Sequence, residues 1–501
     1  MLTFEEFEAQ AKSHNVVPLV RRSMADTLTP VSAYLTLRKE GVASFILESV
    51  EPDEKIGRFS FIGTDPRVLI SARGTEVTVR EGGKATVENV SVFAVIRRIL
   101  QRYNVAPLPE PHGLMGGMVG YIGYNAIHSL ERIPVADPGP DDEDDAILGL
   151  FGTVVQFDHR LQVMTIIHNA FLDRKIPLNL QYDAARSALE DFEQRLRHPP
   201  SVSGGFSCAA GTDREEPDRS TFLDAVQRAR EFITEGDIFQ VVLSRRVRRE
   251  FTGDLFAVYR ALRMINPSPY LFYLDFGRTR LAGSSPEVLV RSRDRKVEVL
   301  PIAGTRKRGA NPEEDDALEA ELLADAKELA EHVMLVDLGR NDVGRIAEYG
   351  TVQVPVFKRV DRYSHVMHIV SEVHGRLREG MSPVDTLEAC FPAGTVSGAP
   401  KVRAMEIINE LETVPRGAYA GAVGYFGFDG ALETCIAIRT IVACGDMMKI
   451  QSGAGIVADS DPAREYEETV SKARALLEAV DLASAGLLSP RLTQPDGRRA
   501  R

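Results

Sequence analysis

The most constraining feature of this sequence is a glycine-rich pattern that occurs twice, in segments far apart along the chain. Residues 117–124 read GMVGYIGY and residues 421–428 read GAVGYFGF, so both follow Gly-x-Val-Gly-Tyr-x-Gly-aromatic. Glycine inside a strand marks a place where another backbone can approach closely. The repeat predicts two related antiparallel sheets, one in each half of the chain. The alternative is a chance similarity between two glycine-rich strands.

Strand-like runs and amphipathic helices alternate along the rest of the chain. In the first half, VASFILES and FSFIG read as strands, VTVREGGKATVENV as a hairpin with a Gly-Gly turn, and LGLFGTVVQF and LQVMTIIHNAF as one strand each. In the second half, FLDAVQRAREFITEG has helical spacing, and YLFYLDF, LAGSSPEVLVRS and VEVLPIAG are expected to form an antiparallel meander. The pattern predicts an α+β fold with two facing antiparallel β-sheets and surrounding helices.

The 501 residues are enough for two or three domains. A stretch rich in Pro, Gly and Ser, HPPSVSGGFSCAAGTDREEPD, indicates a linker. We expect an N-terminal lobe at residues 1–196, a linker at 197–218 and a second domain at 219–483. The Ser/Pro/Arg-rich residues 484–501 are expected to form a disordered tail.

Composition narrows the possible partners and compartment. The net charge of -12 argues against nucleic-acid and acidic-membrane binding. No apolar run reaches the length of a transmembrane helix, and the N-terminal MLTFEEFEAQAKSH lacks the core of a signal peptide. The four cysteines show no CxxC spacing, so a zinc site or disulfide framework is not expected. We expect a cytoplasmic protein in a reducing environment.

Two predicted helices carry paired carboxylates. The first is expected to bury one stripe and to present Glu328 and Glu331 on the other face; its stripe is Leu322, Ala326, Leu329, Val333 and Val336. The second is expected to present Glu465, Glu468 and Lys472 opposite a buried stripe of Tyr466, Val470, Ala473 and Leu477. Carboxylates on two helices suit Mg²⁺, which leaves positions for substrate oxygens. The alternative is that both faces are merely solvated.

Several loops have the composition of anion-binding elements. LPIAGTRKRG at residues 300–309 combines a Gly-Thr pair with basic residues, FPAGTVSGAPK leads into a predicted helix start near Pro400, and QSGAG offers backbone donors. Arg439 ends a predicted strand, where its guanidinium could clamp a carboxylate. Together these elements predict a small polyanionic substrate, held partly through a divalent cation.

A further strand is predicted in DRYSHVMHIVSEVHG, with one face formed by Val366, His368, Val370 and Glu372. His368 is either a general base or a structural residue of that strand. His365 and His368 form an HxxH pair, but on a strand they point to opposite faces, so we do not expect them to share a metal.

These motifs resemble, in order, those of the chorismate-utilising enzymes. The resemblance runs from about Phe222 to Leu477 and rests on PIAGT, ELAEHVMLVDLGRNDVGRI, VDRYSHVMH, FPAGTVSGAPKVRAMEII, YAGAVGYFGFDG, CIAIRT, QSGAGIVADSDP and EYEETVSKA. FILES, GRFSFIG and NPSPY resemble the large subunit (component I) of anthranilate synthase, so the similarity covers most of the chain.

The resemblance implies specific roles for residues of this sequence. It implies that Glu331 and Glu468 bind Mg²⁺, with Glu328 and Glu465 close by. It implies that Glu287 protonates the departing ring hydroxyl of chorismate and that His368 assists the elimination of pyruvate, with help from Thr395 and Lys472. The residues implied to hold the substrate carboxylates are Gly304, Thr305, Tyr419, Arg439, Gly453, Ala454 and Gly455.

The resemblance also implies the reaction. Ala303 stands where enzymes that make 4-amino-4-deoxychorismate usually carry a nucleophilic lysine, and Gln240 stands where isochorismate and salicylate synthases carry a lysine that activates water. Both positions favour direct attack by ammonia, which leads to anthranilate, the first committed step of tryptophan biosynthesis. The alternatives are an aminodeoxychorismate synthase, a tryptophan-sensing module without catalysis, and a phenazine-type relative that stops at the aminated intermediate.

Two partners follow from the same resemblance. None of the segments FSCAA, EACFP, ETCIA and VACGD looks like the nucleophile turn of an amidotransferase, so a separate glutamine amidotransferase subunit (component II) would supply ammonia, in a heterotetramer. Tryptophan would act as a feedback inhibitor in an allosteric pocket formed by Leu47, Glu48, Ser49, Lys55, Pro269, Tyr270 and Leu271. The alternative is that FILES and NPSPY are only strand and turn signals.

Overall fold

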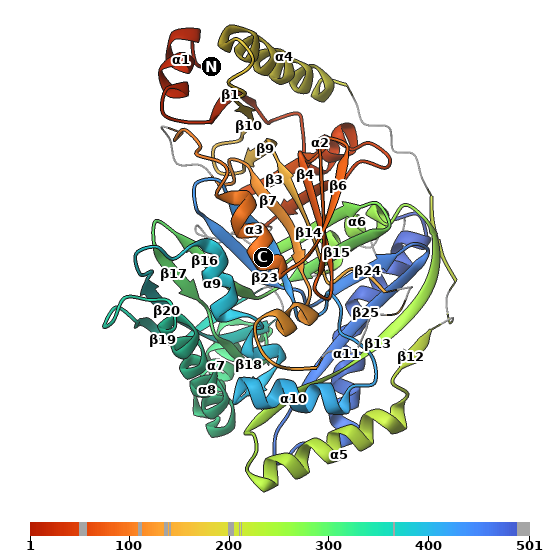
Figure 1. Ribbon diagram of the computed structural model, residues 1–501. Helices are drawn as coiled ribbons and strands as arrows, with labels where there is room; N and C mark the ends of the chain where they lie inside the picture. The colour runs from red at the N-terminus through yellow and green to blue at the C-terminus, as the bar shows by residue number, and fades with distance from the viewer. Residues whose placement is uncertain are drawn as a thin grey trace.

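The computed structural model describes residues 1–49, 58–108, 113–134, 139, 142–198, 205–209, 211, 213–363 and 366–487. Two large antiparallel sheets form the centre of the molecule, and helices surround them (Figure 1). The predicted α+β fold class is therefore confirmed. In the part of the chain that is described, no helix is long and apolar enough to cross a membrane.

The first sheet contains strands from both halves of the chain. Its order is β1 (Val16–Met24), β10 (Val163–Phe171), β9 (Thr153–Asp158), β3 (Phe59–Thr64), β2 (Ser44–Glu48), β14 (Tyr270–Phe276), β15 (Thr279–Ser285), β24 (Thr440–Cys444), β25 (Met447–Ile456), β13 (Gln240–Gly253) and β11 (Phe206–Cys208). The short strands β12 (Arg214–Glu216) and β21 (Gly398–Ala399) also pair with β13. Strands β11 and β12 lie within the stretch 197–218, whose role as a boundary remains a prediction.

The second sheet is also antiparallel and likewise contains strands from both halves of the chain. Its order is β18 (Ile302–Lys307), β20 (Val366–Arg376), β17 (Lys296–Val299), β16 (Val288–Arg293), β23 (Leu432–Ile436), β22 (Ala422–Gly427), β7 (Gly117–Ile122), β8 (Ala146–Phe151), β4 (Val68–Arg73), β5 (Glu76–Glu81) and β6 (Lys84–Asn89). Strand β19 (Gln353–Arg362) pairs with β20 beside it. The predicted Gly-Gly hairpin is present as β5 and β6.

The repeated glycine pattern joins the two halves of the chain. Strands β7 and β22 are neighbours in the second sheet, with Gly120 opposite Gly424. A Cβ atom at either glycine would collide with a backbone carbonyl oxygen of the next strand. The prediction of one sheet in each half was therefore wrong: the two segments are neighbours in a single sheet, and their glycines allow the adjoining strands to approach closely.

The predicted meander was also wrong, and prolines explain why. LAGSSPEVLVRS divides at Pro286 into β15 in the first sheet and β16 in the second, and VEVLPIAG divides at Pro301 into β17 and β18. Proline has no N–H to donate to a strand ladder, so each strand ends there. The first division places Glu287 at the crossing between the two sheets. In LGLFGTVVQF, Gly152 similarly separates β8 from β9.

Helices cover the outer faces of the sheets. Figure 1 shows α1 and α4 at one end of the molecule and α5, α10 and α11 at the other. The helices and 3-10 turns are α1 (Phe4–Ala11), α2 (Pro30–Leu37), α3 (Val92–Leu100), η1 (Tyr124–Ser129), α4 (Leu178–Leu196), α5 (Arg219–Glu235), α6 (Phe256–Ile265), α7 (Pro312–Ala324), α8 (Ala326–Gly344), α9 (Pro383–Cys390), η2 (Gly394–Val396), α10 (Lys401–Leu411) and α11 (Pro462–Ser484). Residues 488–501 of the predicted tail lie outside the described residues.

The apolar stripe predicted across Leu322 and Ala326 was wrong. Leu322 belongs to α7, and Asp325 begins a new helix by accepting hydrogen bonds from the backbone of Lys327 and Glu328. The cap resets the helical phase. The buried face of α8 is consequently His332, Leu335, Val336, Gly339, Asp342 and Val343, whereas Ala326 is exposed.

The two sheets pack on each other through one apolar cluster. Phe45 and Phe272 contribute from the first sheet, and Tyr121 and Val423 contribute from the second. Further clusters fill the spaces between the sheets and the helices. This packing holds the sheet crossing at Glu287 in a mostly buried position.

Candidate active site

Strands β18 and β20 bring the Gly-Thr pair to His368. A register shift between Ala303 and Thr305 leaves Gly304 as an extra residue with a φ of +72°, which glycine adopts readily. His368 Nδ1 lies 3.1 Å from the Gly304 carbonyl oxygen and 3.0 Å from Thr305 Oγ1. Since a carbonyl only accepts, Nδ1 donates there and Nε2 is left with its lone pair.

The environment of His368 favours the neutral imidazole. Burial lowers the pKa of His368, the bond to Gly304 opposes this, and the positive charge of Arg439 lowers it further. A neutral histidine with a free lone pair is able to accept a proton. The predicted strand around His368 is confirmed, whereas His365 lies outside the described residues.

Glu287 lies beside three of the other predicted residues. Burial raises its pKa to about 7, while Thr395, Arg439 and Lys472 act in the opposite direction. Burial also lowers the pKa of Arg439, and Glu287 opposes that change. The charge of Arg439 therefore influences both Glu287 and His368, and we describe the three residues as one candidate site. Among the described residues, no carboxylate lies within ion-pair distance of the Arg439 guanidinium, which leaves it available for an anionic ligand.

Strand β25 provides the backbone of QSGAG next to Tyr419. Gly453, Ala454 and Gly455 pair with β13, and a Cβ at Gly453 would lie 2.7 Å from the Tyr419 hydroxyl oxygen. Lys472 Nζ donates to the Gly453 carbonyl oxygen at 3.0 Å. Burial raises the pKa of Tyr419, so its hydroxyl remains protonated and can donate to an anion.

The four candidate metal ligands lie on α8 and α11. Burial and the neighbouring Glu331 raise the pKa of Glu328, although Arg306 lowers it. Burial and Glu468 raise the pKa of Glu465, although Ser460 lowers it. The positive charge of Lys327 on α8 also lowers the pKa of Glu465 on α11, so charges on the two helices influence each other.

Two of these ligands have partners within the protein. Glu331 accepts a hydrogen bond from Gln240 Nε2 at 3.2 Å, and Glu468 forms an ion pair with Lys472 at 2.8 Å. Both members of the latter pair are about half exposed, and such pairs contribute about 0–1 kcal/mol. A carboxylate whose pKa is raised by a neighbouring carboxylate is in an arrangement that a divalent cation relieves. The residues present therefore fit Mg²⁺.

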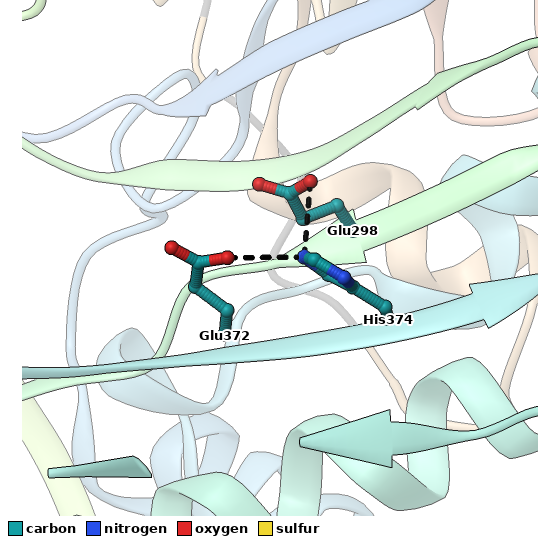
Figure 2. A group of neighbouring side chains, drawn as sticks. All are labelled: Glu298, Glu372 and His374. Atoms are coloured by element: carbon teal, nitrogen blue, oxygen red, sulfur yellow. Dashed lines mark ion pairs between the residues drawn. The ribbon is translucent and has the colours of Figure 1, made fainter. Parts of the chain in front are cut away.

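A second acidic group was not predicted as a metal site. Figure 2 shows His374 Nε2 facing Glu298 at 3.1 Å and Glu372 at 3.3 Å, and in the described part of the chain this is the group whose three ligand atoms lie within 4.8 Å of one another. No three of the four predicted ligands meet that distance. However, Arg291, Lys296 and Arg359 already pair with Glu298 and Glu372, so three cations oppose two carboxylates. We interpret the group as an ion-pair network.

A cavity of about 350 Å³ lies between the two sheets. It brings together six of the seven residues predicted for the allosteric pocket, Leu47, Glu48, Ser49, Pro269, Tyr270 and Leu271. The seventh, Lys55, lies outside the described residues. Ser49 Oγ is buried and has no hydrogen-bond partner among the residues that the structure describes.

Sequence reasoning missed the side of this cavity formed by the second sheet. Strands β16, β22 and β23 contribute Arg291, Arg293, Tyr425 and Glu433, and Glu433 accepts a hydrogen bond from the Tyr270 hydroxyl at 2.7 Å. The repeated glycine pattern was the available signal, because Gly424 and Tyr425 belong to it. Charged groups of both signs beside aromatic rings suit an aromatic amino acid.

The two-sheet fold and the grouping of Glu287, Arg439 and His368 suit an enzyme that acts on a small anionic substrate. The chain belongs to the family of chorismate binding enzymes, whose model matches residues 43–478. Anthranilate synthase component 1 of Aquifex aeolicus is 43% identical over 495 residues and covers 96% of this chain and 98% of its own length. The same enzyme component of Pseudomonas aeruginosa is 45% identical over 489 residues, with 96% and 98% covered.

Solved structures agree with these relatives. Anthranilate synthase component I of Streptococcus pneumoniae superposes with a TM-score of 0.74 at 35% identity and covers 91% of this chain and 99% of its own. The isochorismate synthase MenF of Escherichia coli has a TM-score of 0.69 at 21% identity, covering 95% and 98%, and shares the fold. The predicted resemblance to anthranilate synthase component I is confirmed.

Proposed function

We propose that this chain converts chorismate and ammonia into anthranilate, pyruvate and water. The observation that carries the proposal is the cluster of Glu287, Arg439 and His368, which combines a carboxyl group of pKa about 7, an unpaired guanidinium and a neutral imidazole. The anthranilate synthase components that resemble the chain over nearly its full length support it.

The anion-binding elements would orient the substrate. Chorismate carries two carboxylates, and Arg439, Thr305, Tyr419 and the backbone N–H groups of residues 453–455 offer donors to them. Charge-assisted hydrogen bonds from a guanidinium and from backbone amides are stronger than neutral ones. Fixing both carboxylates would hold the ring beside Glu287 and His368, which lowers the entropic cost of reaction.

The acid and the base would act in succession. As ammonia forms its bond to the ring, protonated Glu287 gives its proton to the departing hydroxyl, which leaves as water. In the second step His368 assists removal of a ring proton while the enolpyruvyl C–O bond breaks. The ring becomes aromatic, and the released enol takes up a proton to form pyruvate. One group is therefore needed protonated and the other deprotonated at the same pH.

Mg²⁺ would be held by Glu331 and Glu468, with Glu328 and Glu465 close by. When bound, the ion supplies a positive centre for the ring carboxylate of chorismate. The half-exposed Lys472 would release Glu468 at little cost. Gln240 donates to Glu331 and so keeps that carboxylate oriented.

Two residues favour ammonia over other nucleophiles. Ala303 in β18 pairs with Ile369 of β20, and its methyl side chain has no group that could attack the ring. The Gln240 amide donates to Glu331 and has no basic lone pair with which to activate water. These features oppose aminodeoxychorismate and isochorismate chemistry.

A partner would supply the ammonia. Burial raises the pKa of Cys390, Cys435, Cys444 and Cys208, so none of the four is poised as a thiolate nucleophile. We propose that a separate glutamine amidotransferase subunit releases ammonia for this chain. The reduced thiols and the proposed reaction fit a cytoplasmic enzyme.

Tryptophan would inhibit the enzyme from the cavity between the sheets. The cavity of about 350 Å³ has a size typical of ligand pockets, and the unpartnered Ser49 hydroxyl with Glu433 and Arg293 offers partners for the amino and carboxylate groups. Because both sheets line it, an occupant could change how they pack, which is a physical basis for allostery.

The test is a fluorescence assay of the purified chain with chorismate, Mg²⁺ and an ammonium salt, repeated with glutamine as the sole nitrogen source. We expect anthranilate from ammonium and none from glutamine. Chorismate consumption without anthranilate would support an aminodeoxychorismate-type reaction. Binding of tryptophan without consumption of chorismate would support a sensor.

A further inference from the structure

We propose that Arg416, clamped by Glu412, is a positioning residue that sets the geometry of Thr395 and Tyr419 at the candidate active site. The proposal rests on the proposed function. The sequence did not single out Arg416 or Glu412. We assign neither of them a direct contact with the reacting atoms of the substrate. Arg416 lies in the loop between α10 and β22, three residues before Tyr419.

The side chain of Arg416 is almost completely enclosed. Its exposed fraction is 2%, and that of Glu412 is 6%. Two parallel bonds join the pair: Arg416 Nη2 donates to Glu412 Oε1 at 2.7 Å, and Nε donates to Oε2 at 2.8 Å. Arg416 also donates to two backbone carbonyls, from Nη1 to Val396 at 2.6 Å and from Nη2 to Val242 at 2.6 Å.

These bonds connect three elements of the candidate site. Val396 follows Thr395 in η2, so the bond to its carbonyl restrains the turn that carries Thr395. Tyr419 is held twice, because its N–H donates to the Arg416 carbonyl at 3.1 Å and the guanidinium lies 5.7 Å from the centre of its ring. Val242 lies on β13, two residues after Gln240.

Glu412 extends the connection to the QSGAG strand. Its Oε1 accepts from the backbone N–H of Ser244 at 2.7 Å and from Ser244 Oγ at 2.9 Å. Ser244 is the register partner of Gly453. The pair therefore ties the Thr395 turn, Tyr419 and the backbone around Gly453 to one fixed point.

Only arginine provides this geometry. Its planar guanidinium presents several N–H groups in fixed directions, whereas lysine offers a single charged centre on a flexible chain. A buried ion pair by itself is weak evidence for stabilisation, since desolvation opposes attraction. Here the remaining donors meet carbonyls of functional segments, which points to a role in orientation.

Arg249 supplies a matched control. It lies on β13, its side chain is 7% exposed, and it pairs with Asp213 and, at 3.0 Å, with Asp481. Among the described residues, the hydrogen-bond and ion-pair partners of Arg249 include none of the candidate site residues. Arg249→Lys should therefore lower the melting temperature without changing kcat or KM, as expected for a buried arginine with only a structural role.

The experiment compares Arg416→Lys, Glu412→Gln and Arg249→Lys with the wild type, using chorismate and ammonium in the presence of Mg²⁺. For Arg416→Lys we expect kcat/KM to fall by about 10- to 100-fold, the size seen when support of functional groups is loosened. We expect KM to rise, because Tyr419 and the QSGAG backbone hold substrate. Glu412→Gln keeps the shape of the side chain and should show a smaller change in the same direction.

A pH profile separates positioning from lost stability. Thr395 holds the pKa of Glu287 down, so a loosened Thr395 turn should move the alkaline limb of kcat/KM to higher pH in Arg416→Lys, while Arg249→Lys leaves it unchanged. Suppose that the wild type is active and that Arg416→Lys and Glu412→Gln both show the same kcat, KM and pH profile as Arg249→Lys. This result would overturn the positioning role of Arg416 and leave the proposed function standing. If Arg416→Lys does not fold, Glu412→Gln decides in the same way. A wild type that makes no anthranilate would overturn the proposed function and this proposal together.

Discussion

Replacing Glu287 with glutamine tests the acid at the sheet crossing through both activity and stability. Glutamine keeps the size of the protonated carboxyl group and cannot release a proton. If Glu287 protonates the departing hydroxyl, Glu287→Gln should lower kcat by about 10²- to 10⁴-fold, the usual contribution of a general acid. Chorismate binding should change little, because no substrate carboxylate depends on Glu287.

The magnitude for stability follows from the pKa. Burial raises the pKa of Glu287 from its ordinary value of 4.5 to about 7. About half of the protein is then protonated at pH 7, against about 0.3% for an unperturbed carboxyl group. At about 1.4 kcal/mol for each tenfold change in proton affinity, the rise corresponds to at most about 3 kcal/mol, and solvent access reduces this.

The sign follows from linkage. The folded-state pKa of Glu287 lies above the unfolded value, so the wild type is most stable relative to the variant below pH 4.5. The wild type loses this relative stability as the pH rises from 4.5 through 7. Glu287→Gln has no such dependence. We therefore expect equal free energies of unfolding near pH 4.5 and a variant more stable than wild type, by up to about 3 kcal/mol, at pH 8.

The assay is urea unfolding of both proteins at several pH values, followed by circular dichroism. Glu298→Gln is a control of opposite sign, because Arg291 and other cations outweigh burial and hold the pKa of Glu298 below its ordinary value. That variant should be less stable than wild type at pH 8 and should approach it as the pH falls. A stability difference for Glu287→Gln that is the same at pH 5 and pH 8 would refute the raised pKa.

Four further substitutions test the other elements. Glu468→Ala should abolish turnover supported by Mg²⁺, because a proposed ligand is lost; full activity that still requires the metal would place the ion elsewhere. His368→Met should let an aminated intermediate accumulate, detectable by chromatography with mass analysis, and normal anthranilate formation would remove His368 from the elimination step. Ser49→Phe should fill part of the cavity and weaken inhibition by tryptophan while kcat is unchanged; an unaltered inhibition curve would reject the pocket. Gly304→Ala should raise KM for chorismate, because a φ of +72° costs a residue with a Cβ about 1–2 kcal/mol, and an unchanged KM would show that this backbone does not hold substrate.

Local sequence was a good guide to the type of each element. The helix at Arg219–Glu235, the strand at Val366–Arg376 and the Gly-Gly hairpin were all predicted from periodicity and turn residues. Boundaries were less accurate where a single residue resets the pattern. Asp325 divided a predicted helix, and Pro286 and Pro301 divided predicted strands, because a cap or a missing N–H outweighs hydrophobic spacing.

The candidate site was predicted as a set of residues without its geometry. Motif resemblance selected Glu287, Arg439, His368 and the four glutamates, and the structure brings Glu287, Arg439 and His368 into one electrostatic environment. Nothing in the sequence indicated Arg416. Its proposed role depends on hydrogen bonds that it donates to the backbone carbonyls of Val396 and Val242, which belong to two distant segments.

The sequence by itself determined the alternation of strands and helices, the loops that suit anions and the absence of a nucleophile at Ala303, because these depend on residue type and short-range spacing. Only the tertiary structure decided that both halves of the chain share both sheets, since strand pairing joins residues far apart and periodicity does not name the partner. The same packing produced the cavity between the sheets and buried Glu287 where they cross. The pKa of that carboxyl group depends on how much water and charge surround it, and folding alone sets that environment.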